Sequence, residues 1–434
     1  MLIADHNKKR LPEILPEDVY VLIHQHFVVS TTLSYHGRLL LVKLNFQVES
    51  DIILKFYNKR GLFVIPLVDL KKQYKTIKKD VDAAVKGVLQ RTDFIMGQDL
   101  RLFEEEFAKF CTTKYCVGVD SGTGALELAF HALGLKSGDE VLVPCFTFYA
   151  TASAVAATGA KPIFVDVEDE TGNMDPQRLE KAVTSKTKAI VPVHLFGQPV
   201  NMPEIVSFAK RHNLPLVEDS AQAHGARFKM ENIGWKTAGS VGAMGCFSFY
   251  PGKNLGAYGD AGAVVTNSQE YAEKLKLLRD YGRTGKYEHS ILGFNRRMDT
   301  LQAAILRVKL RKLVLWNEAR RKNAELYDKL LGKIGVRTFK ILPFTESVRH
   351  VYAIRTPHRD ELAEFLKKND VATGVHYPVA LHLQKAFAPL GGKRGDCPVG
   401  EKIASEILSL PIYPELKESE IRKIAGLIEK FLKK

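Results

Sequence analysis

The hydrophobic positions of this chain change their spacing several times, which predicts a fold in which helices and strands alternate. Between residues 68 and 89 apolar side chains recur every three to four positions and lysines fill much of the rest, as in an amphipathic helix. The stretch 141–167 instead holds two short apolar runs around an alanine-rich segment, and predicts strand, helix and strand. This alternation is typical of an α/β protein with a mostly parallel central sheet and helices on both faces.

Composition shifts divide the chain into three parts. From about Leu310 the sequence turns to charged helix, which marks the start of a different packing unit. We therefore expect a larger domain over 63–310 and a smaller C-terminal α+β domain over 311–434. Residues 1–62 include strand-like segments but no catalytic constellation, so we predict an extension outside the catalytic fold, with a short accessory module as the alternative.

The overall composition is that of a soluble globular protein. The 434 residues are 45% apolar, yet no apolar run approaches the 18 residues of a membrane span, and the N-terminus lacks a signal-peptide pattern. Five cysteines without CxxC spacing favour reduced thiols in a cytoplasm, with no zinc site and no disulfide framework.

The formal net charge of +14 bears on possible partners. The basic residues are dispersed and no run of five occurs, so we do not expect nucleic acid to be a partner. A positive field would favour an anionic substrate such as a nucleotide diphosphate sugar. A basic composition bias would explain the charge equally well.

Two side chains that could take part in catalysis lie at or just after apolar runs in the stretch 217–266. Asp219 ends the first run, and Lys253 follows the second by a few residues. Pyridoxal phosphate chemistry needs such a pair, because an amine must condense with the cofactor aldehyde and a carboxylate must keep the pyridine nitrogen protonated. Either residue alone is more often an ordinary solvated side chain. Small or apolar neighbours on both sides of Lys253 would, however, desolvate its amine and lower its pKa.

Two nucleotide-binding motifs fail in the same stretch. A Walker loop needs a glycine at position 247 and a serine or threonine at position 254, which hold Phe247 and Asn254. A dinucleotide fingerprint needs GxGxxG, whereas Gly239, Gly242 and Gly245 are spaced three apart.

An anion site is predicted further towards the N-terminus. A short apolar strand at 117–119 leads into the turn Asp120-Ser121-Gly122-Thr123-Gly124 and an apolar helix. A helix that begins at a glycine turn presents free backbone amides and its positive dipole end to a phosphate. Ser121 or Thr123 could instead simply cap the helix.

At these residues the chain resembles the DegT-type sugar aminotransferases, a family of fold-type I pyridoxal phosphate enzymes that aminate keto groups of nucleotide-linked sugars. The resemblance runs from about Ile65 to the C-terminus with the motifs in the family's order. It implies that Lys253 binds the cofactor aldehyde and Asp219 the ring nitrogen. Further cofactor contacts implied by it are phosphate contacts from Thr123, Gly124, Ser248 and Asn295, ring stacking by Phe148, and a hydrogen bond from Gln222 to the phenolic oxygen.

The resemblance also implies a reaction. An amino group would pass from glutamate to a keto carbon of a nucleotide diphosphate sugar, at C3 because VDLKKQY and FIMG resemble the 3-keto branch. His376 and Tyr377 would lie near the substrate, and Asn295 would reach the phosphate of a second subunit in a homodimer with shared sites. Related sugar dehydratases carry histidine in place of the lysine, so the presence of Lys253 argues against dehydratase activity in this chain. A cofactor-binding regulator or sensor without turnover is the alternative.

Overall fold

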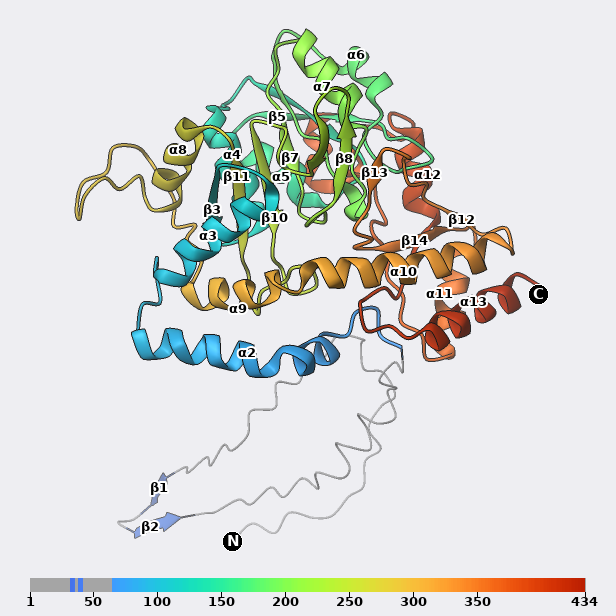
Figure 1. The fold of residues 1–434 in the computed structure, drawn as a ribbon, viewed down its shortest axis with the longest axis horizontal. Helices are drawn as coiled ribbons and strands as arrows, with labels where there is room; N and C mark the ends of the chain where they lie inside the picture. Colours follow the sequence, from blue (N-terminus) through green and yellow to red (C-terminus); the bar gives the residue numbers. More distant parts are fainter. Residues whose placement is uncertain (1–31, 36–37, 42–64, 434) are drawn as a thin grey trace. The chain divides into compact units, whose positions relative to one another are not determined.

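The computed structural model describes residues 32–35, 38–41 and 65–433 of a chain that divides into two compact units, 1–61 and 62–434 (Figure 1). In the first unit β1 (Thr32–Tyr35) and β2 (Arg38–Leu41) form an antiparallel pair. The rest of the predicted extension lies outside the described residues, and its relation to the catalytic fold stays a prediction.

Seven strands of the second unit form one sheet. Two parallel bridges, Ile190 to Leu216 and Val193 to Asp219, join a three-stranded part to a four-stranded part. The resulting order is β5-β4-β6-β7-β10-β11-β3, in which only β11 runs antiparallel. The predicted mostly parallel sheet is confirmed. Its strands are β3 (Tyr115–Val119), β4 (Glu140–Pro144), β5 (Lys161–Val165), β6 (Thr187–Ile190), β7 (Val217–Asp219), β10 (Met244–Ser248) and β11 (Gly262–Thr266).

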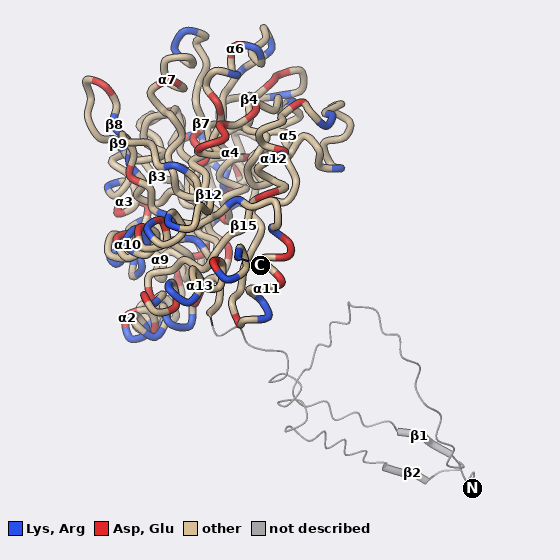
Figure 2. Tube along the Cα trace, turned by 90° about the vertical axis from the view of Figure 1, so that its right-hand side faces the viewer, with Lys and Arg blue, Asp and Glu red and all other residues tan. Residues whose placement is uncertain are grey.

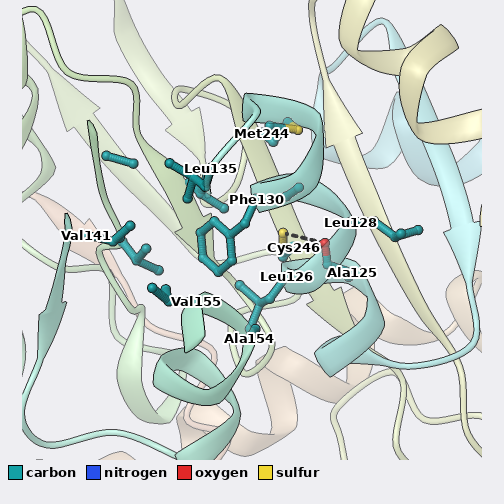
Figure 3. Packing of buried hydrophobic residues seen from close by; sticks show 14 of the residues in the cluster. Ala125, Leu126, Leu128, Phe130, Leu135, Val141, Ala154, Val155, Met244 and Cys246 are labelled. Atoms are coloured by element: carbon teal, nitrogen blue, oxygen red, sulfur yellow. Dashed lines mark hydrogen bonds between the residues drawn. The ribbon is translucent and has the colours of Figure 1, made fainter. Parts of the chain in front are cut away.

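Alternating side chains of these strands face two different hydrophobic cores. Val117 and Val264 belong to the core that α4, α5 and α8 cover, whereas their neighbours Cys116 and Val265 belong to the core under α3 and α9. Figure 3 shows the first core around Phe130 of α4. The predicted helices on both faces are thus present. The helices of this part are α2 (Leu70–Arg91), α3 (Gln98–Cys111), α4 (Gly122–Leu133), α5 (Tyr149–Ala157), α6 (Leu179–Ala182), α7 (Met202–Arg211), α8 (Gln269–Arg279) and α9 (Thr300–Leu310), with short 3-10 turns η1 (Pro176–Arg178) and η2 (Leu195–Gly197).

The C-terminal part packs helices against a small antiparallel sheet of order β12-β14-β15. Its core also takes in Ile65, which bridges to Val371. The predicted boundary at 310/311 stays a prediction. The elements are α10 (Leu313–Gly332), β12 (Arg337–Thr338), β13 (Thr345–Glu346), β14 (Tyr352–Arg355), α11 (Arg359–Lys368), η3 (Leu381–Leu383), η4 (Lys385–Leu390), α12 (Pro398–Glu406), β15 (Ile407–Leu410) and α13 (Glu418–Leu432); β13 pairs with the hairpin β8 (Arg227–Met230) and β9 (Gly234–Thr237).

Charged residues are spread over the second unit. Basic and acidic positions are interspersed along the trace (Figure 2), which is the dispersed pattern that the sequence indicates. Among the described helices, none is both long enough and apolar enough to cross a membrane.

Candidate active site

A cavity of about 630 Å³ lies where the carboxyl ends of β3, β4, β7 and β10 meet. Parallel strands end at the same edge of a sheet, and ligands of open α/β sheets bind at that edge. Gly124 and Asn295 do not line this cavity. The other eight residues that the sequence selects all line it: Thr123, Phe148, Asp219, Gln222, Ser248, Lys253, His376 and Tyr377.

Asp219 is the last residue of β7, and its carboxylate lies at the floor of the cavity. The residue is buried and pairs in register with Cys246 of β10. Thr151 Oγ1 donates to Asp219 Oδ2 over 2.7 Å, and the Ala221 N–H donates to Oδ1 over 3.1 Å. Burial nevertheless raises the pKa of this carboxyl above its usual value. A cationic partner in the cavity would remove that penalty.

Lys253 lies five residues beyond the end of β10 and points its amine into the same cavity. Burial lowers the pKa of Lys253 to about 8, while the nearby Asp219 carboxylate opposes the shift. Near pH 8 about half of such amines are neutral, compared with well under 1% for a lysine of ordinary pKa, roughly 10.4. This shift agrees with the expected desolvation of the lysine, and it suits the amine to act as a nucleophile.

The loop that carries Lys253 is held by Asn254, which the sequence analysis did not select. Its side-chain amide donates to Asn317 Oδ1 and to the Val348 carbonyl over 2.9 and 3.0 Å. Its Oδ1 lies 3.0 Å from His350 Nδ1, and His350 itself lines the cavity. Because Asn254 is buried and these three contacts fix both ends of its amide, the loop has little freedom to turn the lysine away.

The N-terminus of α4 forms the opposite end of the cavity. Ser121 caps the helix by accepting from the Gly124 N–H, and Thr123 faces the cavity. Ser248 lies against this turn, since a Cβ placed on Gly122 would come within 2.5 Å of the Ser248 Cβ. The helix end thus has free backbone amides and two hydroxyls nearby, which suit an anion.

Three of the predicted residues form one wall. Phe148 is 53% exposed although it follows a buried strand, so its ring belongs to the cavity and not to the core. Its centroid lies 5.7 Å from that of Tyr377. The Gln222 side-chain amide donates to the Tyr377 hydroxyl over 2.9 Å and accepts from the Phe196 N–H over 2.7 Å. One N–H of Gln222 therefore remains for a ligand.

Two further histidines surround Lys253. His376 lines the cavity with Nδ1 2.8 Å from Ser409 Oγ. His224 is buried, with Nε2 2.9 Å from the Ser248 carbonyl. Burial and the nearby Lys253 charge lower the pKa of His224 to about 3, so it stays neutral and supports the end of β10.

The remaining two predicted residues lie elsewhere. A side chain at Gly124 would meet Asp120 Oδ1 at 2.2 Å, so the turn itself requires glycine there. Asn295 is exposed in the segment between α8 and α9, where its backbone bridges to Asp280. This position leaves its side chain outside the cavity of its own chain.

The lining residues fit pyridoxal phosphate. The buried Asp219 carboxylate keeps a raised pKa even with Lys253 nearby, the Lys253 amine has a lowered pKa and is available as a nucleophile, and a helix N-terminus with two hydroxyls suits an anion. A phosphorylated pyridine aldehyde satisfies all three at once.

Comparisons with known proteins cover the same region. The pleiotropic regulatory protein of Geobacillus stearothermophilus is 45% identical over 370 residues, which are 85% of this chain and 98% of its own. A dTDP-3-amino-3,4,6-trideoxy-alpha-D-glucose transaminase of Streptomyces venezuelae is 43% identical over 368 residues, 85% of this chain and 96% of its own. Among solved structures, S. venezuelae DesV in complex with a ketimine intermediate superposes with a TM-score of 0.82 at 41% identity, covering 85% of this chain and 99% of that one.

The structural match extends over nearly the whole of the solved aminotransferase chain and confirms the expected fold-type I architecture. The family comparison matches residues 75–429, from the first helix of the second unit to its last. The chain therefore belongs to the DegT/DnrJ/EryC1/StrS aminotransferase family.

Proposed function

We propose that this chain is a pyridoxal phosphate-dependent aminotransferase that moves an amino group from glutamate to the C3 keto carbon of a nucleotide diphosphate sugar. The family and its transaminase relatives support amino transfer to a sugar. The observation that carries the proposal is the pairing of Lys253, with a pKa of about 8, and the buried Asp219 in one cavity.

The residues divide the work as follows. Bound pyridoxal phosphate supplies the electron sink and carries the amino group between the two halves of the reaction. The Asp219 carboxylate would stabilise a positive charge at the ring nitrogen, and that charge would in turn keep the carboxylate ionised. Lys253 Nζ would hold the aldehyde at rest. Once released, it would take a proton from the donor's α-carbon and pass it to the cofactor, and in the second half it would take a proton back from the cofactor and give it to the sugar carbon. A pKa near the working pH allows the amine to act in both directions.

The other lining residues orient the ring. The hydroxyls of Thr123 and Ser248, with the backbone amides of the turn that includes Gly124, would hold the phosphate. Phe148 would stack on the ring face, and the free N–H of Gln222 would donate to the phenolic oxygen.

The substrate and assembly follow the same resemblance. His376 and Tyr377 line the cavity and would contact the sugar. The exposed Asn295 supports a homodimer in which it completes the phosphate site of the second subunit. The five free thiols suit a cytoplasmic location.

The test is a half-reaction. The absorption spectrum of the purified protein with bound pyridoxal phosphate is recorded before and after glutamate is added, and the 2-oxoglutarate formed is measured. Wild type should show a lysine-bound cofactor band that glutamate removes, with one ketoacid formed per site. Lys253→Ala should show neither effect, whereas Lys188→Ala, an exposed lysine on β6, should behave as wild type.

The outcomes separate the two functions considered. A wild-type band that persists after glutamate would favour a regulator that binds cofactor without turnover. Conversion by Lys253→Ala at the wild-type rate would refute the role of the lysine. A panel of nucleotide-linked 3-keto and 4-keto sugars, added to the aminated enzyme, then decides the keto position.

A further inference from the structure

Three residues that are far apart in the sequence meet in the interior beside the active site. Cys145 follows β4, His382 lies in η3, and Cys397 is the N-cap of α12. Their ligand atoms all lie within 4.8 Å of one another, and all three residues are buried. The sequence analysis expected no zinc site because the cysteines are scattered, but the fold brings two of them and a histidine together.

The histidine of this group is oriented as a metal ligand would be. His382 Nε2 lies 3.0 Å from Glu401 Oε1, whereas the buried Nδ1 has the Cys397 thiol nearby but makes no hydrogen bond of good geometry with it. A histidine that binds a metal through one ring nitrogen usually donates its other N–H to a carboxylate. A cation bound by Nδ1 would give this buried nitrogen a proper partner.

The charges around the group also favour a cation. Asp166 is buried with Oδ1 3.5 Å from Cys145 Sγ, and the Glu401 carboxylate lies behind His382. A disulfide between Cys145 and Cys397 would use both sulfurs but leave His382 Nδ1 without a partner. Two thiolates and one imidazole are instead the ligands that zinc prefers.

We propose that Cys145, His382 and Cys397 bind one zinc ion, with its fourth position taken by water. The ion would have a structural role and would hold part of the active-site wall in place. Cys145 lies three residues before Phe148. Its carbonyl accepts a hydrogen bond from the Leu381 N–H over 2.7 Å, and Leu381 follows shortly after Tyr377 in the chain. Zinc would thus tie the wall of the cavity to the start of α12.

The experiment measures metal content in the untagged full-length protein. Protein from zinc-replete cells is dialysed and analysed by mass spectrometry for metals, and we expect about one zinc per chain. Cys397→Ser and His382→Gln should each lose it. Cys111→Ser, an equally buried thiol in the core under α3, should retain it.

A milder variant keeps the test valid if ligand variants fold poorly. Glu401→Gln leaves all three ligands in place and should weaken zinc binding about 10- to 100-fold in a competition with a chelating dye. Cobalt added to the metal-free wild type should give a thiolate charge-transfer band that Cys397→Ser lacks.

Three results would overturn the proposal. The first is wild-type protein without zinc and without a cobalt band. The second is the same zinc content in wild type and Cys397→Ser. The third is a disulfide between Cys145 and Cys397, seen as a non-reduced chain that is two hydrogens lighter and as a linked pair of peptides containing these two residues, both reversed by a reductant.

Discussion

Replacing Thr151 by valine tests how the structure keeps the Asp219 carboxylate ionised. The two side chains have nearly the same shape, so the main loss is the 2.7 Å hydrogen bond from Thr151 Oγ1 to Asp219 Oδ2. A hydrogen bond to a charged group contributes about 1.5–3 kcal/mol. At 1.36 kcal/mol per unit, the pKa of Asp219, already raised by burial, should rise by roughly one to two units more.

The consequence should be weaker cofactor binding. If the whole loss falls on the ionised carboxylate, pyridoxal phosphate should bind up to roughly 10- to 150-fold more weakly, measured by spectral titration of the cofactor-free protein. The loss should shrink as the pH is raised, because a higher pH restores the ionised form.

The matched control is Thr266→Val. Thr266 is equally buried on β11, but its hydroxyl donates to the Ala243 carbonyl at the opposite edge of the sheet. It should lose some stability and keep the wild-type affinity for the cofactor. If Thr151→Val bound cofactor as tightly as Thr266→Val at every pH, the hydrogen bond would not be what sustains the charge of Asp219.

Three other predictions concern the same cavity. In cofactor-free protein, Lys253→Met should raise the free energy of unfolding at pH 7 by up to roughly 3 kcal/mol, because burial lowers the lysine pKa to about 8. The unfolded chain binds more protons between pH 8 and 10.5, so this gain should fade across that window in denaturant titrations; an equal gain at pH 7 and pH 10 would contradict it. Gly122→Ala should weaken cofactor binding at least tenfold, since its Cβ would meet Ser248 at 2.5 Å, whereas Gly426→Ala, with open space around it, should instead stabilise α13 by up to about 1 kcal/mol. Mixed Lys253→Ala and Asn295→Ala subunits should be more active than either variant alone, because exchange leaves one intact site per mixed dimer; no gain after verified exchange would argue against shared sites.

The main features of the fold could be predicted from local patterns. Strands such as β4 are apolar and buried after their first residue because both faces of the sheet are covered, and α2 shows a clear helical period. The direction of β11 could not be predicted this way. Its five buried residues look like those of a parallel strand, and only its pairing with β3 and β10 makes it antiparallel.

The site was predictable where a residue carries the chemistry itself and not where it supports another residue. Lys253 and Asp219 stand out because few side chains can perform their roles. Thr151 and Asn254 do not stand out in the sequence. Thr151 is 68 positions from Asp219 and Asn254 is 63 positions from Asn317, and no spacing rule links residues that far apart. The same limit hides the meeting of Cys145 with His382 and Cys397, which depends on three segments folding together.

β7 ends in two adjacent acids, Glu218 and Asp219, and the sequence alone does not show which of them faces the cofactor site. Successive side chains of a strand point to opposite faces, so Glu218 faces away from the cavity when Asp219 faces into it. Burial acts to raise the pKa of Glu218, but His194 and the N–H groups of Gly239 and Gly242 outweigh it and lower the pKa. Glu218 is therefore a satisfied internal anion, whereas Asp219, with fewer donors, keeps a raised pKa although the nearby Lys253 acts to lower it. A slip of one residue in the pairing of Asp219 with Cys246 would exchange these environments and remove the carboxylate from the cavity.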